Sequence, residues 1–115
     1  MIKFSRNNAW NQHGTFNNPD LLWYAKGVGV MQSRPLNDVT SWWFFAAIHG
    51  FSSAQWSNFS TPPVVPTSPV PSNAIRGLYW DQCQHQSWFF APWHRGYLIE
   101  LEAQIRAVVI SLGGP

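Results

Sequence analysis

The chain has 115 residues, so it forms one small domain at most, and a chain of this size buries only about two thirds of the surface that its unfolded form exposes. Charged residues make up 10% of the chain, below the roughly 25% of typical soluble domains, whereas aromatic residues reach 17% and include eight tryptophans. The net charge of +2 comes without a run of basic residues, which argues against a nucleic-acid partner, and no stretch approaches the roughly 20 apolar residues of a membrane span.

So few polar residues cannot cover the whole surface of a folded domain. We therefore expect a large apolar face that contacts something else. The N-terminal residues lack the apolar core of a signal peptide, which predicts a cytoplasmic protein or one exported by another route. The one cysteine, Cys83, cannot form a disulfide within the chain, so the cysteine count leaves the redox compartment open.

The first predicted helix follows a polar, irregular arm over residues 1–18, in which His13 is expected to be a solvated loop histidine with no ligand role. Three residues suit the start of this helix as N-cap, first helical residue and acidic first-turn residue: Asn18, Pro19 and Asp20. The helix is predicted to run to about Gln32, with Leu21, Leu22, Ala25, Val28 and Met31 as its buried stripe. Gly27 and Gly29 weaken its second half, because each costs about 1 kcal/mol relative to alanine inside a helix.

A second helix is predicted from about Thr40 to His49, capped by Thr40 or Asp38 and stopped by Gly50. Its apolar face carries residues at i, i+3 and i+7: Trp42, Phe45 and His49. His49 would therefore end a buried stripe. A histidine in that position is more often a hydrogen-bonded core residue than a metal ligand.

Residues 51 to about 78 are rich in proline, serine, threonine and valine. The prolines are Pro62, Pro63, Pro66, Pro69 and Pro71. Proline at this density disfavours both helix and strand, which predicts an extended, partly polyproline-like surface loop. This loop is expected to return Cys83 to the neighbourhood of His49.

The last predicted helix begins at Pro92, which suits a first helical turn because its missing N–H would be unpaired there. Apolar residues then recur at steps of three and four: Trp93, Tyr97, Leu101, Ile105, Val108 and Leu112. Gly113 and the two residues after it stop the helix. His85 and His94 stand nine residues apart and would face opposite ways on one straight helix of about 3.6 residues per turn. We therefore expect His85 in the preceding loop and His94 in the first turn.

A histidine in the first turn is favoured as the neutral ring, because the positive end of the helix dipole disfavours an imidazolium. Neutral imidazole is the form that binds a metal ion. From spacing alone, two hydrogen-bonded core histidines explain His85 and His94 equally well. Three histidines would also suit a zinc hydrolase.

Two segments together resemble a known family. Cys-x-His, followed by a histidine inside Phe-x-x-Trp-His-Arg-x-Tyr-Leu-x-x-x-Glu, resembles the first copper-binding region of tyrosinases, catechol oxidases and molluscan hemocyanins. The matching positions are Phe90, Trp93, His94, Arg95, Tyr97, Leu98 and Glu102. The segment from Ser41 to Gly50 resembles the family's earlier ligand segment, with His49 as the ligand. The resemblance runs from about Asp20 to Pro115.

The resemblance implies an all-α fold in which residues 1–115 form the first-copper half of an antiparallel four-helix-bundle core, with a long Pro-rich loop. It implies that His49, His85 and His94 bind one copper ion.

The resemblance also implies a thioether bond between Cys83 and a ring carbon of His85, which would hold that loop residue in one rotamer. An ordinary buried free cysteine is the alternative. Phe90 and neighbouring aromatic residues would exclude water from the ligands, and Arg95, Tyr97 and Glu102 would have structural roles.

The activity implied by the resemblance is that of a tyrosinase-like copper oxidase, which hydroxylates monophenols to catechols, oxidises catechols to quinones with dioxygen, or does both. The family's completed centre holds two coppers, each with three histidines. Only His49, His85 and His94 remain here once His13 is set aside. A second polypeptide, a cleaved second half of the same precursor or a symmetric copy is expected to supply the other three histidines. The alternative is a non-enzymatic mononuclear copper-binding module or a hemocyanin-like oxygen carrier.

Overall fold

The computed structural model describes residues 6–59 and 64–115, and every regular element in these two ranges is a helix. In chain order these are the 3-10 helix η1 (Asn11–Gly14), α1 (Pro19–Gln32), α2 (Trp42–Ala47), α3 (Ser53–Trp56), α4 (Asn73–Tyr79) and α5 (Phe90–Ser111). The predicted all-α fold class is therefore confirmed. None of the described helices combines the length and the apolar character that crossing a bilayer requires.

The helix α1 has the predicted bounds. Its start is capped as expected, because the Asn18 side chain accepts a hydrogen bond from the Asp20 N–H at 3.0 Å. Its predicted buried stripe is only partly right. Met31 is fully buried, whereas the residues expected beside it are only half buried: Leu21, Leu22, Ala25 and Val28. The other fully buried residue of α1 is Gly27.

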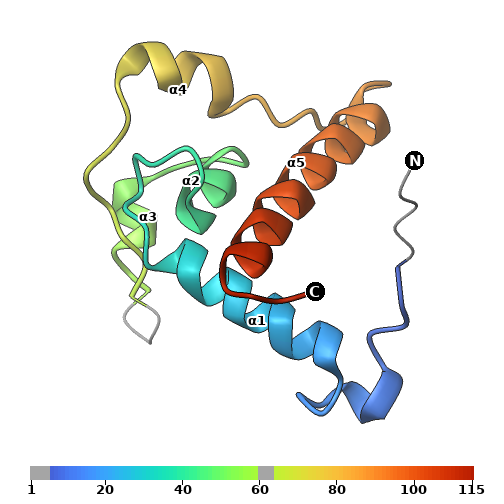
Figure 1. Ribbon diagram of the computed structural model, residues 1–115. Helices are drawn as coiled ribbons and strands as arrows, with labels where there is room; N and C mark the ends of the chain where they lie inside the picture. Colours follow the sequence, from blue (N-terminus) through green and yellow to red (C-terminus); the bar gives the residue numbers. More distant parts are fainter. Residues whose placement is uncertain (1–5, 60–63) are drawn as a thin grey trace.

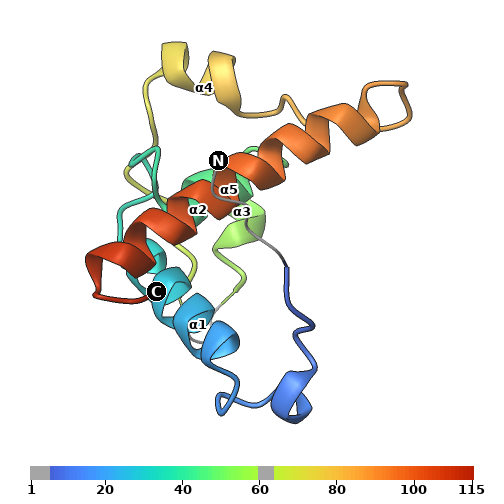
Figure 2. The ribbon, with the colours of Figure 1, turned by 45° about the vertical axis from the view of Figure 1, so that its right-hand side comes forward.

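Gly27 is the point where α1 meets α5. A Cβ on Gly27 would lie 3.2 Å from methyl carbons of Ile105 and Val109. The absence of a side chain therefore allows the two helices to approach closely, which outweighs the intrinsic helix penalty of glycine. Figures 1 and 2 show α1 against the C-terminal half of α5, while the N-terminal half of α5 extends beyond α1.

The helix α2 is shorter than predicted at both ends. Its N-cap is Ser41, not Thr40 or Asp38, because the buried Ser41 hydroxyl accepts hydrogen bonds from the N–H groups of Trp43 and Phe44. The Asp38 carboxylate instead accepts hydrogen bonds from the N–H and hydroxyl of Thr40, which closes the turn before the helix.

The end of α2 leaves the predicted ligand outside the helix. The helix ends at Ala47, and Gly50 has a φ of +125°, so His49 lies in the turn between them. The prediction that His49 ends a buried stripe is wrong, because its side chain is exposed, whereas Phe45 on the same face is buried.

The region over 51–78 is less uniform than predicted. The stretch with Pro66, Pro69 and Pro71 has no regular structure, as expected, and Pro62 and Pro63 lie outside the described residues. The expectation of one continuous loop is wrong, however, because α3 and α4 lie on either side of the prolines. Each begins at a serine whose hydroxyl accepts a backbone hydrogen bond, Ser52 for α3 and Ser72 for α4.

The core lies where α2 meets α1, α5 and the residue after α4. Its buried members are Met31, Leu36, Trp43, Phe44, Phe45, Ala47, Ile48, Trp80 and Val108. Trp80 is the largest of the fully buried side chains, and its ring lies 4.9 Å from that of Phe51 and 5.9 Å from that of Phe44, between centroids. The segment around α4 is therefore attached to the core through Trp80, with further contacts from Ile75 and from Tyr79, whose ring lies 5.8 Å from that of Phe44.

The helix α5 begins at Phe90, two residues before the predicted start, so Pro92 is its third residue and His94 its fifth. Pro92 still lies in the first turn, but the prediction that His94 lies there is wrong. The predicted stripe packs against the core up to Val108. Leu112 was assigned wrongly to it, because the helix ends at Ser111 and Leu112 is 45% exposed.

Candidate metal centre

Three separate segments bring four metal-binding side chains together. His49 comes from the turn after α2, Cys83 and His85 from the loop between α4 and α5, and His94 from α5. One donor atom from each of His49, Cys83 and His94 lies within 4.8 Å of the other two. These three form the one cluster of this kind among the residues that the structure describes.

His85 lies beside this cluster. The Sγ of Cys83 is 3.4 Å from Nε2 of His85 and 3.4 Å from Nε2 of His94. The rings of His85 and His94 are stacked, with their centroids 5.7 Å apart, and the ring of His49 is 5.6 Å from that of His94. The structure therefore gathers all three predicted ligands, but the sulfur of Cys83 lies between two of them.

The tautomer of His94 follows from its own helix. Its Nδ1 lies 2.7 Å from the carbonyl oxygen of Phe90, one turn earlier in α5. A carbonyl only accepts hydrogen bonds, so Nδ1 must carry the hydrogen, and Nε2 of the neutral ring keeps its lone pair. Nε2 is therefore the nitrogen available to a metal ion, and it faces Cys83. The thiol of Cys83 can donate its one hydrogen to it.

The water-excluding role expected of Phe90 is wrong for the described residues, because Phe90 is 47% exposed, and its contribution is instead to position His94. Its ring lies 4.2 Å from the ring of His94, and its carbonyl holds the other side of the same histidine. The i, i+4 spacing of Phe90 and His94 was visible in the sequence, but it carried no signal that the contact would involve the backbone. A hydrogen bond to the nitrogen opposite the metal is how proteins usually orient a histidine ligand.

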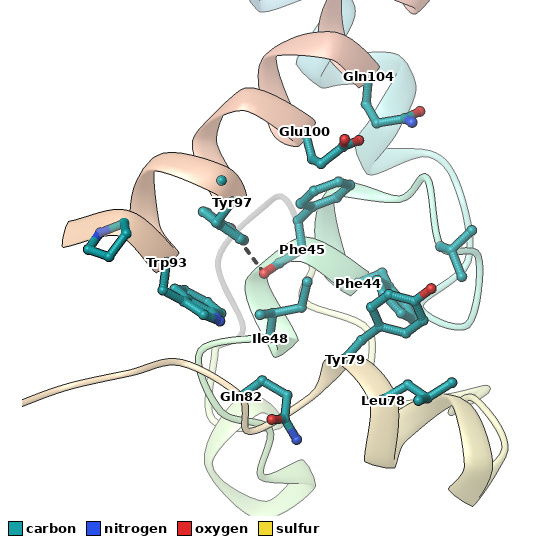
Figure 3. Close-up of a pocket in the computed structure, with 13 residues that line it drawn as sticks. Phe44, Phe45, Ile48, Leu78, Tyr79, Gln82, Trp93, Tyr97, Glu100 and Gln104 are labelled. Carbon is teal, nitrogen blue, oxygen red and sulfur yellow. Dashed lines mark hydrogen bonds between the residues drawn. The ribbon is translucent and has the colours of Figure 1, made fainter. Parts of the chain in front are cut away.

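Two stacked aromatic residues hold His49. The rings of Trp93 and Tyr97 are nearly parallel, at 9°, and both lie edge-on to His49, with centroid distances of 5.7 Å and 4.6 Å. The Tyr97 hydroxyl donates a hydrogen bond to the Phe45 carbonyl at 3.0 Å, which ties α5 to the end of α2 (Figure 3). This bond fixes the turn that carries His49.

The surroundings of His49 and Cys83 favour the uncharged forms of these two side chains. Loss of solvent around His49 lowers its pKa, and repulsion by His94 and His85 lowers it further. Burial likewise raises the pKa of the Cys83 thiol. A neutral imidazole is the form that can donate a lone pair to a metal ion.

The remaining predicted residues lie away from the cluster. His13 is exposed in η1, where its φ is +58°. Glu102 accepts hydrogen bonds from Arg6 and Arg106, so it joins the N-terminal arm to α5 as a structural residue. Arg95 is exposed on α5.

Comparisons with known proteins cover the part of the chain that carries this cluster. Residues 39–113 match the family model described as the common central domain of tyrosinase, a range that includes His49, Cys83, His85 and His94. The chain is also similar to "Tyrosinase HcTyr1" of Hahella sp. (strain CCB-MM4), with 37% identity over 101 residues. The match covers 83% of this chain and 20% of that protein, so the chain spans about a fifth of the length of this relative.

Proposed function

This chain belongs to the tyrosinase family, and on that premise we propose that it supplies the histidine ligands of one copper ion in a tyrosinase-like copper oxidase. The observation that carries the proposal is the convergence of His49, His85 and His94 from three segments, with Cys83 between them. The donor set fits copper, because imidazole nitrogen suits copper and copper stands highest in the general affinity order of the divalent metals. Bound copper would supply electron exchange with dioxygen.

The protein's own part is to hold the donors in place and, at His49, to favour the neutral ring. His49, His85 and His94 would be the ligands. Trp93 and Tyr97 orient His49, and the Phe90 carbonyl orients His94 and holds its hydrogen on Nδ1. The lowered pKa of His49 keeps its ring uncharged in neutral solution.

We assign to Cys83 a thioether bond with a ring carbon of His85. The choice of His85 comes from the Cys-x-His resemblance, and the 3.4 Å between the sulfur and Nε2 of His85 is compatible with it, because both carbons bonded to that nitrogen are then near the sulfur. The sulfur is equally far from Nε2 of His94, so the distance alone does not choose between the two rings. The new S–C bond replaces the S–H bond and one ring C–H bond. Two protons and two electrons pass to an oxidant, for which dioxygen suffices, since it takes them up as hydrogen peroxide. The bond would fix the one ligand that stands on a loop.

The second copper would take three histidines from outside these 115 residues. The chain has four histidines, and His13 lies in η1 apart from the other three. The further three would come from another polypeptide, from another part of the same precursor or from a symmetric copy. The relative from Hahella is about five times as long as the stretch matched here, which leaves ample chain for such residues in a protein of that kind. The proposed substrates are phenols or catechols, with dioxygen.

One observation favours a second candidate. His49, Cys83 and His94 alone place three donor atoms within 4.8 Å, and two histidines with one thiolate are a known mononuclear copper arrangement. In that case the chain would be a copper-binding or oxygen-carrying module without oxidase activity.

Catechol oxidation decides between the two candidates. With copper and any accompanying polypeptide present, quinone absorbance should appear and should be lost in His94→Ala. Reversible oxygen binding without any quinone would support the module instead.

A further inference from the structure

A cavity of about 630 Å³ lies between α2, α4 and α5 (Figure 3). Its volume falls within the roughly 300–1,000 Å³ of small-molecule sites. The walls are mainly apolar, and the aromatic residues among them are Phe44, Phe45, Tyr79, Trp93 and Tyr97. Such a space accepts a flat apolar body of one or two rings.

The cavity is polar at its two ends. Glu100 and Gln104 lie at one end and Gln82 lies near the other, with the aromatic residues between them (Figure 3). Glu100 is the one charged residue among the described residues that line the cavity. The cavity therefore has an apolar middle and a negative charge at one end, which is complementary to an aromatic body that carries a cation.

Gly96 leaves the backbone of α5 open to the cavity. It lies in the interior of α5 and lines the cavity, and a Cβ on it would meet nothing within 4 Å. Its φ is not positive, so neither a turn nor close packing explains the glycine within the described part of the chain. Glycine inside a helix costs about 1 kcal/mol relative to alanine. Gly29 and Gly77 are equally open, so the glycine does not by itself indicate a ligand, but it gives one room to lie against the backbone of α5.

We propose that this cavity is a binding site for a small aromatic amine in its protonated form. The rings lie among Phe44, Tyr79 and Trp93, and the ammonium group lies beside Glu100. The site is distinct from the metal centre, because none of the four donor residues lines it, but it is adjacent, since Trp93 and Tyr97 line the cavity and also contact His49. The proposal does not depend on copper, so it can fail or succeed separately from the proposed function.

The test uses the full metal-free protein, labelled with ¹⁵N, and tryptamine as the probe. Tryptamine has two rings and an ammonium group but no phenol, so oxidation plays no part. We expect binding on the order of 1 mM, as ligand efficiency suggests for about a dozen non-hydrogen atoms. The amide of Gly96 and the indole N–H of Trp93 should shift. Indole-3-propionate, which has the opposite charge, should bind roughly three-fold or more weakly.

Two variants locate the binding. Glu100→Gln should weaken tryptamine roughly three-fold, the modest effect expected of an exposed ion pair, without weakening indole-3-propionate. Gly96→Leu should place a side chain in the cavity and weaken binding of both probes. Gly29→Leu is its matched control, since Gly29 is another helix-interior glycine whose Cβ would meet nothing within 4 Å.

Three outcomes would overturn the proposal. The first is that tryptamine shifts neither the amide signal of Gly96 nor the indole N–H signal of Trp93. The same result would be obtained if another part of the full protein occupied the cavity, and the proposal would then also be wrong. The second is equal affinity for the two probes with no effect of Glu100→Gln. The third is unchanged tryptamine binding in Gly96→Leu, checked against an unchanged far-ultraviolet circular dichroism spectrum.

Discussion

The Sγ of Cys83 lies 3.4 Å from Nε2 of His94, although the two residues belong to different segments, a loop and a helix. The same sulfur is equally far from Nε2 of His85. Cys83 is therefore central to the cluster, and its chemical state decides how the cluster can be used. A free thiol would compete for the metal, whereas a thioether would leave the site to the imidazoles.

Mass spectrometry can identify that state. After copper loading in air, we expect a cross-linked peptide that contains Cys83 and His85 and is two hydrogens lighter than the free peptide. Cys83 should no longer react with an alkylating reagent after denaturation. Complete alkylation of Cys83 would rule out the thioether, but it would not contradict copper binding by the histidines.

Cys83→Ala should weaken copper binding by roughly 10–100-fold, the loss typical of a residue that orients a metal ligand. The reason is that His85 would then rest on a loop without its anchor. Competition with a chelator of known affinity measures the change. Affinity equal to that of the wild type would show that Cys83 does not support the site.

Replacing any one of His49, His85 or His94 by alanine should abolish tight copper binding, because each removes one of three proposed ligands. His13→Ala is the control and should bind as the wild type does, since His13 is exposed in η1. Metal analysis should find one copper per chain. Two tightly held coppers per isolated chain would contradict the ligand assignment.

Tyr97→Phe should destabilise the fold by about 1 kcal/mol, because it removes the hydrogen bond to the Phe45 carbonyl. It should also weaken copper binding, since that bond fixes the turn of His49. Urea denaturation and chelator competition measure the two effects. Tyr24→Phe, at an exposed tyrosine of α1, should change neither.

Gly27 and Gly29 form a matched pair for the contact between α1 and α5. Gly29→Ala should stabilise the protein by about 0.5–1 kcal/mol through helix propensity, because its Cβ meets nothing within 4 Å. Gly27→Ala should leave the protein about 1–3 kcal/mol less stable than Gly29→Ala, because its Cβ must displace Ile105 and Val109. Equal free energies of unfolding for the two variants would contradict the observed packing.

Sequence reasoning worked best where a signal was local. The cap at Asn18 and the apolar spacing after it predicted α1 with its observed bounds. The α2 boundaries failed because Thr40, Asp38 and Ser41 can all cap a helix, and burial of the Ser41 hydroxyl decides among them. Burial is a property of the folded chain, so it cannot be predicted from the few residues around the start of a helix.

The candidate site was only partly accessible from sequence. The resemblance indicated His49, His85 and His94, and the structure brings these three together. Sequence could not indicate that Cys83 would contact two histidines, or that His49 would be exposed, because both depend on how the loop before α5 folds back. Trp80 was missed for the same reason, since its burial arises from contacts with the distant Phe44 and Phe51.

The hydrogen bond from Nδ1 of His94 to the Phe90 carbonyl lies entirely within α5, so it persists for as long as that turn of the helix persists. His49 is tied to the same helix through Tyr97 and Phe45. The other two donors, Cys83 and His85, depend on a loop, and loops open at a lower free-energy cost than helices packed on a core. If that loop opened locally, His49 and His94 would stay in place while Cys83 and His85 moved away. A metal ion could then enter or leave without unfolding of the helices.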